Sequence, residues 1–88
     1  MKQCMCVRVY KANSKEFLEE YVMTQAKKNQ IEGIGQFIDP DQVQIFVCAK
    51  QAGIEKFLDA LYEAGNEKIE IEPCSLERDF RGVFRIVE

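Results

Sequence analysis

Apolar and polar residues alternate along several stretches of the chain, with the period of two that is typical of a strand with one buried face. The stretches are residues 4–10, 42–49 and 68–72, and residues 83–87 can add a short final strand. Asp39, Pro40 and Asp41 separate residues 31–38 from residues 42–49. Because proline presets a turn and aspartate can bond nearby amides, we expect a hairpin at this point.

Two other segments have helical spacing of their apolar residues, residues 15–29 and residues 51–64. Asn13 and Ser14 precede the first segment, and either can cap a helix with its side-chain oxygen. Gly65 follows the second segment, where a helix end favours a residue that tolerates positive φ. We therefore expect two helices of three to four turns.

The expected order is βαββαβ with a short additional strand at the C-terminus. Two helices that each have one apolar stripe can cover one face of a mostly antiparallel sheet and leave the other face open. The fold class is therefore α+β, a ferredoxin-like split βαβ sandwich. At 88 residues without a linker or repeat, we expect a single domain over residues 1–88.

The composition excludes several classes of function. An apolar share of 47% and a charged share of 31% are typical of a folded globular protein. No apolar run is long enough to span a bilayer, and the net charge of -3 has no stripe of Lys and Arg beside it, so we expect a cytoplasmic protein that binds neither membrane nor nucleic acid. Histidine is absent, which removes the commonest general base and the usual zinc ligand.

Four stretches of the chain resemble the acylphosphatase family. The sequence MCVRV at 5–9 resembles the first strand of that family, AKKNQIEG at 26–33 its helix end and turn, FLDAL at 57–61 its second helix, and FRI at 84–86 its closing strand. The resemblance covers nearly all of the chain and implies the same fold.

The resemblance also implies where a catalytic site would lie. In that family a glycine-rich loop after the first strand holds a phosphate with its amides, an arginine at the helix start binds it, and an asparagine on the second strand orients the attacking water. Here residues 11–19 contain no glycine, and Glu19 and Phe37 occupy the positions of the arginine and the asparagine. A unit charge about 4 Å away at an effective dielectric of about 20 contributes about 4 kcal/mol, so we expect Glu19 to repel a phosphate.

Weak anion binding is still expected near the helix start from three residues: Lys11, Ser14 and Lys15. Lysines do not replace the forked guanidinium of an arginine. Glu19 itself has an ordinary explanation, because acidic residues are common in the first turns of helices.

All four cysteines have the strand parity opposite to the helix-covered face, and the topology is expected to bring them to one end of the sheet: Cys4, Cys6, Cys48 and Cys74. Without an export signal we expect them to be reduced and free. Their spacing lacks the C-x-x-C turns of structural zinc sites, and a cysteine is by default a small apolar residue. A thiol-based metal or redox site is the third hypothesis for function, and no cofactor is expected.

The open face also has a mixed apolar and charged surface, made by Tyr10, Phe46, Lys68, Glu70 and Glu72. Such a surface is either an ordinary solvated face or a protein contact. The first hypothesis is a non-catalytic acylphosphatase-like domain that binds a protein partner or itself, as a homo-oligomer, through this face or an edge strand. The second is an acylphosphatase that hydrolyses carboxyl-phosphate anhydrides through a divergent site.

Overall fold

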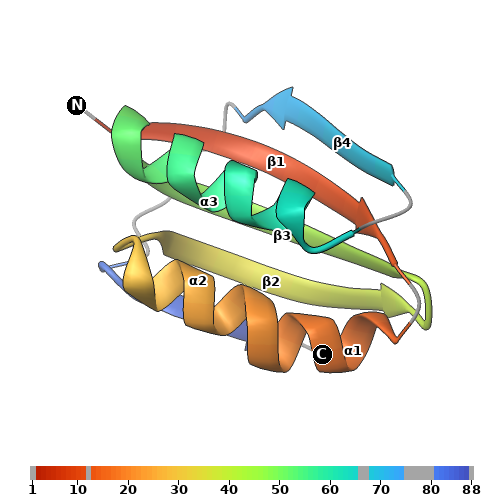
Figure 1. The fold of residues 1–88 in the computed structure, drawn as a ribbon. Helices are drawn as coiled ribbons and strands as arrows, with labels where there is room; N and C mark the ends of the chain where they lie inside the picture. The colour runs from red at the N-terminus through yellow and green to blue at the C-terminus, as the bar shows by residue number, and fades with distance from the viewer. Residues whose placement is uncertain (1, 12, 66–67, 75–80, 88) are drawn as a thin grey trace.

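The computed structural model describes residues 2–11, 13–65, 68–74 and 81–87. Its strands are β1 (Lys2–Tyr10), β2 (Glu32–Asp39), β3 (Gln42–Lys50), β4 (Lys68–Pro73) and β5 (Phe84–Val87). Its helical segments are α1 (Ser14–Glu16), η1 (Phe17–Val22), α2 (Met23–Lys28) and α3 (Gln51–Glu63). The first three follow one another directly and form one helical rod with a π-helical middle (Figure 1).

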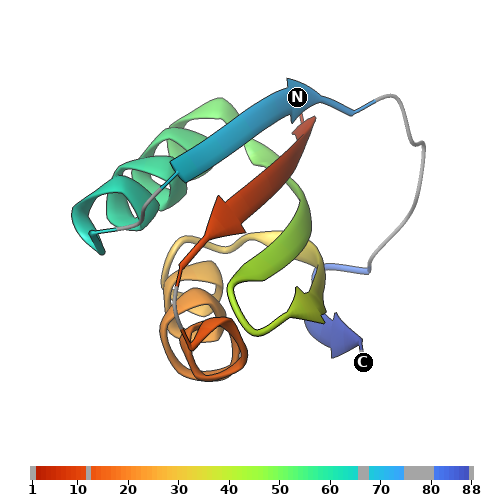
Figure 2. The same ribbon diagram turned by 90° about the vertical axis from the view of Figure 1, so that its right-hand side faces the viewer.

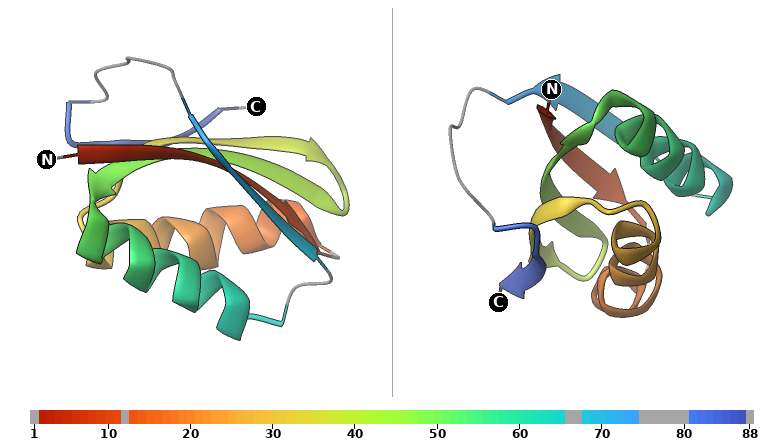
Figure 3. Two further views of the ribbon diagram at one scale, coloured as in Figure 1. Left: turned by 90° about the horizontal axis from the view of Figure 1, so that it is seen from above. Right: turned by 90° about the vertical axis from the view of Figure 1, so that its left-hand side faces the viewer.

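The strands form one sheet in the order β4-β1-β3-β2-β5. Strand β1 is antiparallel to both β3 and β4, whereas β5 is parallel to β2. Both helices lie on the same side of this sheet, which leaves the opposite face uncovered by helix (Figures 2 and 3). This arrangement confirms the split βαβ sandwich and the additional C-terminal strand.

The core lies between the sheet and the helices. Alternate residues of the neighbouring strands β1 and β3 are fully buried there: Val7, Val9, Val43, Ile45 and Val47. Leu18, Phe57 and Leu61 from the helices are also fully buried and pack in the same cluster. The alternation predicted for these strands is therefore confirmed, and so is the apolar stripe of each helix.

The start of the first helix differs from the prediction. Asn13 has a left-handed backbone (φ 58°) and its side chain makes no capping bond, while the Ser14 hydroxyl donates instead to the carbonyl oxygen of Asp39 at 2.6 Å. The prediction of a side-chain cap was wrong because the chain turns so that Ser14 is completely buried against the hairpin.

The turns and two glycines agree with local physical chemistry. The Asp41 amide donates to Asp39 Oδ1 at 3.2 Å in the predicted hairpin turn, and Gly65 follows α3 with φ +76°. Gly33 on β2 has φ +150°, and a Cβ built there would lie 1.8 Å from the carbonyl oxygen of Phe46. Only glycine allows β2 and β3 to approach this closely. Among the described residues no helix is both long and apolar enough to cross a bilayer.

Candidate functional site

The loop between β1 and α1 is hydrogen-bonded to the β2–β3 hairpin. The Lys11 amide donates to the carbonyl oxygen of Asp41 at 2.8 Å, and the Ser14 amide donates to that of Pro40 at 3.0 Å. The Ser14 hydroxyl adds the bond to Asp39 described above. Three donors of this loop therefore point at hairpin carbonyls and not into open space.

An open groove of about 730 Å³ lies beside this loop. Its lining is formed by Asn13, Ser14, Lys15, Glu16, Glu19, Phe37, Pro40 and Asp41. Glu19 and Phe37, on a helix and a strand, are thus brought to the same groove. The resemblance to the acylphosphatase family had assigned Glu19 and Phe37 to the positions of the catalytic arginine and asparagine, and both residues line this groove.

The three residues expected to bind an anion are divided between two grooves. Ser14 and Lys15 line the groove beside Glu19, whereas Lys11 lines a separate groove with Phe17 and Gly65. The Lys11 ammonium donates to the Ala64 carbonyl oxygen at 3.0 Å and lies 5.4 Å from the centre of the Phe17 ring. The structure therefore does not bring Lys11 together with the other two.

The strength expected for the Glu19 repulsion needs correction. Glu19 is exposed to solvent. At about 4 Å a unit charge contributes about 1 kcal/mol in bulk water and about 4 kcal/mol at the effective dielectric near a protein surface, and solvent exposure moves the contribution of Glu19 toward the lower value. The bonded amides of the loop are consequently a stronger obstacle to phosphate than the charge of Glu19.

The polar half of the open face is internally paired. The Tyr10 hydroxyl donates to Glu70 Oε1 at 2.7 Å, and the Lys68 ammonium lies 5.7 Å from the centre of the Tyr10 ring. This hydrogen bond lowers the pKa of the Glu70 carboxyl and raises the pKa of the Tyr10 hydroxyl. Three of the five residues expected at an interaction surface therefore hold one another in place.

The cysteines correct a second expectation. Cys4 and Cys48 form a disulfide, so the prediction that all four thiols are free was wrong. The reason is the register, because Cys4 on β1 lies directly opposite Cys48 on β3 with the Cα atoms 4.1 Å apart. Cys6 and Cys74 are free and half-buried, and among the described residues no group of three Cys, Asp or Glu side chains is arranged to hold a metal ion.

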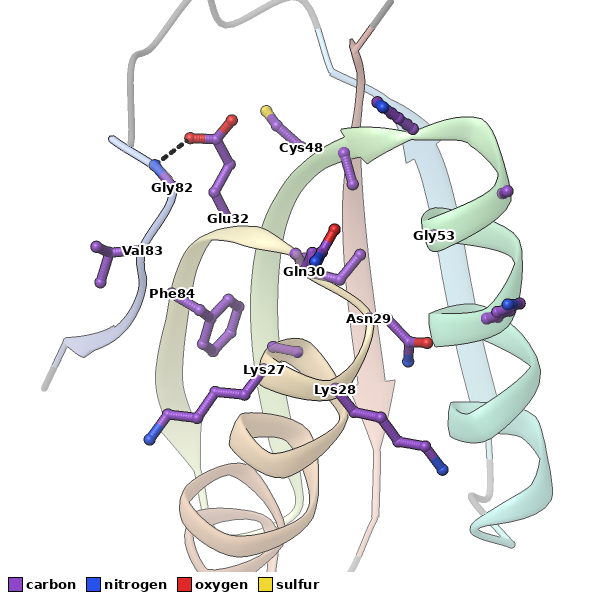
Figure 4. A pocket seen from close by; sticks show the side chains of 16 residues that line it. Lys27, Lys28, Asn29, Gln30, Glu32, Cys48, Gly53, Gly82, Val83 and Phe84 are labelled. Atoms are coloured by element: carbon purple, nitrogen blue, oxygen red, sulfur yellow. Dashed lines mark hydrogen bonds between the residues drawn. The ribbon is translucent and has the colours of Figure 1, made fainter.

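A larger cavity of about 920 Å³, at the opposite end of the sheet from the loop, was not predicted from the sequence (Figure 4). Glu32 and Cys48 line it, and the Glu32 carboxylate accepts the Gly82 amide at 2.8 Å. Glu32 is buried although its strand parity places it on the open face. Its burial depends on the contact with Gly82, 50 residues away, which leaves no signal in the local pattern.

No protein-family model and no curated protein matches the sequence. Solved structures do match. An acylphosphatase from Coxiella burnetii has a TM-score of 0.82 at 21% identity, over 98% of this chain and 93% of that protein. An acylphosphatase from Bacillus subtilis has a TM-score of 0.79 at 21% identity, over the full length of both. The chain has the acylphosphatase fold.

The same fold forms part of a larger protein. Full-length HypF, in a phosphate- and nucleotide-bound form, matches with a TM-score of 0.85 at 18% identity, and this chain covers 12% of it. The acylphosphatase-like fold therefore occurs both as a protein of this length and as one part of a longer one.

Proposed function

We propose that this chain is a non-catalytic acylphosphatase-like domain that associates with a second copy of itself through the open face of its sheet. The observation that carries the non-catalytic part is the bonding of the Lys11 and Ser14 amides to the hairpin. The observation that supports association with a second copy is a row of residues across the open face with opposite charges at its two ends.

The amides of Lys11 and Ser14 are not available to a phosphate while they are hydrogen-bonded to the hairpin. An anion that took the two amides would displace the carbonyl oxygens of Asp41 and Pro40. Each exchange removes one hydrogen bond, which contributes about 0.5 to 1.5 kcal/mol net to stability, and leaves a carbonyl oxygen without its donor. The dipole of a helix start returns only about 0.3 to 1 kcal/mol to an anion.

The charges of the side chains that line the groove also argue against phosphate binding. Glu16, Glu19 and Asp41 line it against one lysine, Lys15. Each exposed charge acts weakly in water, but an excess of acidic groups lowers the local concentration of any phosphate ester. The groove therefore favours neither binding nor hydrolysis of an acyl phosphate.

The row on the open face crosses all five strands. Strand pairing places its members side by side in the order Glu72, Cys6, Phe46, Ile34 and Arg85. Glu72 and Arg85 are exposed and lie on the two edge strands, while the three residues between them are half-buried. Because β3 is the central strand, Phe46 lies at the middle of the row.

Two-fold symmetry gives this row a complementary partner in a second copy. If two open faces pack together about an axis that runs along β3, Phe46 meets Phe46 of the other copy and each Glu72 lies over the other copy's Arg85. Val87, which is 43% exposed and pairs with Gln36 of β2, extends the apolar area on the same side. Two ion pairs then flank an apolar centre.

A charge exchange tests the proposed association. Analytical ultracentrifugation of the wild type should show a mass that rises with concentration toward that of a dimer. Arg85→Glu should shift the protein toward monomer, and the double variant E72R/R85E should restore association because both pairs are formed again with reversed charge. Glu72 and Arg85 lie on opposite edges of one copy, so this rescue cannot arise within a monomer.

A monomer at all concentrations would reject self-association. Association that the double variant fails to restore would reject this geometry.

Hydrolysis is the alternative function, and the groove that brings Glu19 and Phe37 together beside the loop is the observation that favours it. Turnover of benzoyl phosphate by the purified protein should not exceed the rate in buffer. Turnover that Ser14→Ala or Lys15→Ala abolishes would establish the alternative, whatever the oligomeric state.

A further inference from the structure

Three cysteines lie in one row across neighbouring strands. Cys4 on β1 is directly opposite Cys48 on β3. On its other side β1 pairs with β4, where Met5 is opposite Pro73, and the Cys74 amide donates to the Cys4 carbonyl oxygen at 3.2 Å. This bond continues the β1–β4 register by one residue, so Cys4 lies between Cys48 and Cys74.

The hydrogen bonding explains why Cys4 is now joined to Cys48. The Cys4 carbonyl points toward Cys74, so Cys4 and Cys48 are a non-hydrogen-bonded pair, the kind in which side chains of antiparallel strands are closest. Their Cα atoms are 4.1 Å apart. Cys74 is joined to Cys4 by one main-chain hydrogen bond, and the Cα atoms of hydrogen-bonded pairs of antiparallel strands are typically about 5.5 Å apart, which a disulfide also spans.

We propose that this row is a thiol–disulfide exchange site in which Cys4 changes partner between Cys48 and Cys74. The Cys74 thiolate attacks Cys4 Sγ, the Cys4–Cys48 bond breaks, and its electron pair leaves on Cys48 Sγ, which takes up the proton that Cys74 released. The products are a Cys4–Cys74 disulfide and a Cys48 thiol. No net oxidation occurs, so the step needs no external oxidant.

The geometry selects this sulfur as the point of attack. Directly opposed residues of paired strands project from the same face of the sheet, so the three sulfurs follow the order of the row. Cys74 then approaches Cys4 from the side opposite the bond to Cys48, the in-line arrangement that displacement at sulfur requires. Cys74 is free and half-buried, and Cys4 is half-buried, whereas Cys48 is buried at 4% exposure.

The sulfur released by the exchange faces a cavity. Cys48 lines the cavity of about 920 Å³, and Figure 4 shows its sulfur beside the carboxyl end of Glu32. A small reagent in this cavity can therefore trap the Cys48 thiol as it forms. Trapping converts a reversible exchange into a measurable product.

A Cys6→Ser protein allows each disulfide partner of Cys4 to be assigned from its tryptic peptides. Trypsin cuts after Lys2 and Arg8, so Cys4 and Cys6 otherwise share one peptide, while Cys48 and Cys74 fall in peptides 29–50 and 69–78. The folded oxidised Cys6→Ser protein is incubated with iodoacetamide at mildly alkaline pH, quenched with acid, digested without reduction and mapped by mass spectrometry. We expect peptide 3–8 linked to peptide 69–78, with the label on Cys48.

The matched variant adds Cys74→Ser to the same background. Cys48 labelling should then be lost and only the link between peptides 3–8 and 29–50 should remain, with circular dichroism showing that the fold is kept. Labelling of Cys74 alone in the Cys6→Ser protein, with no link from peptide 3–8 to 69–78, would overturn the proposal. Equal Cys48 labelling with and without Cys74 would also overturn it, because an external agent would then open the disulfide.

Discussion

Replacing Ser14 with alanine removes a buried side-chain bond between the loop and the hairpin. The hydroxyl is completely buried and donates to the Asp39 carbonyl oxygen at 2.6 Å. Loss of the bond costs about 0.5 to 1.5 kcal/mol net, and a buried carbonyl left without a donor costs about 1 to 3 kcal/mol. Because Asp39 is only half-buried, water can replace part of this bond, and we expect the free energy of unfolding to fall by about 1 to 2 kcal/mol.

Thr24→Ala is the matched control for this prediction. The Thr24 hydroxyl also donates to a main-chain carbonyl, that of Glu20, at the same 2.6 Å, but this bond is exposed. An exposed change of this kind alters stability by no more than about 0.5 kcal/mol. Urea unfolding followed by circular dichroism should therefore separate the two variants, and thermal unfolding should show a loss of about 5 to 15 °C for Ser14→Ala. Equal stability losses would refute the role given to the buried bond.

Three further changes test other parts of the structure. Gly33→Ala should prevent β2 from pairing with β3, because its Cβ would overlap a carbonyl oxygen; a folded, equally stable variant would contradict this. Tyr10→Phe should raise the lowered pKa of Glu70 toward its ordinary value, as NMR titration of the carboxyl measures, and an unchanged pKa would contradict it. The stability that ionised Glu70 adds is present above its ordinary pKa and is lost as pH falls through the lowered one. Cys4→Ser removes the disulfide to Cys48 and should lower the free energy of unfolding by about 4 kcal/mol or less, since the bridge closes a sequence separation of 44 residues. An unchanged free energy of unfolding in urea would contradict this.

The strands, helices and topology are predictable from the sequence because they follow from local periodicity. Val43, Ile45 and Val47 recur at every second position, and all three are fully buried on the helix side. Gly65 follows its helix with a positive φ because glycine has no side chain and adopts this conformation readily. Information of this kind lies within a few residues of each position.

The bonding of the loop is not predictable in the same way. Ser14 and Asp39 are 25 residues apart, and a serine before a helix is statistically a cap. Only the packed hairpin reveals that the hydroxyl points elsewhere. The burial of Glu32 beside Gly82 depends equally on a distant contact.

The cysteines fall between these two cases. Strand parity correctly assigned Cys4 and Cys48 to the same face, and the topology placed their strands side by side. Whether they lie in register depends on a shift of two residues, which keeps every side chain on its own face and which the pattern of apolar residues therefore does not resolve. The expectation of free thiols relied on the compartment and not on geometry, and it was wrong for this pair.

The proposal that the loop does not hold a phosphate is tested most directly by NMR of its amides. Scalar couplings across the hydrogen bonds should connect the Lys11 amide to the Asp41 carbonyl and the Ser14 amide to the Pro40 carbonyl. Addition of inorganic phosphate should leave these couplings intact and should cause no saturable shift of either amide signal. Loss of the couplings together with saturable shifts of both signals would show that the loop releases the hairpin and binds the anion.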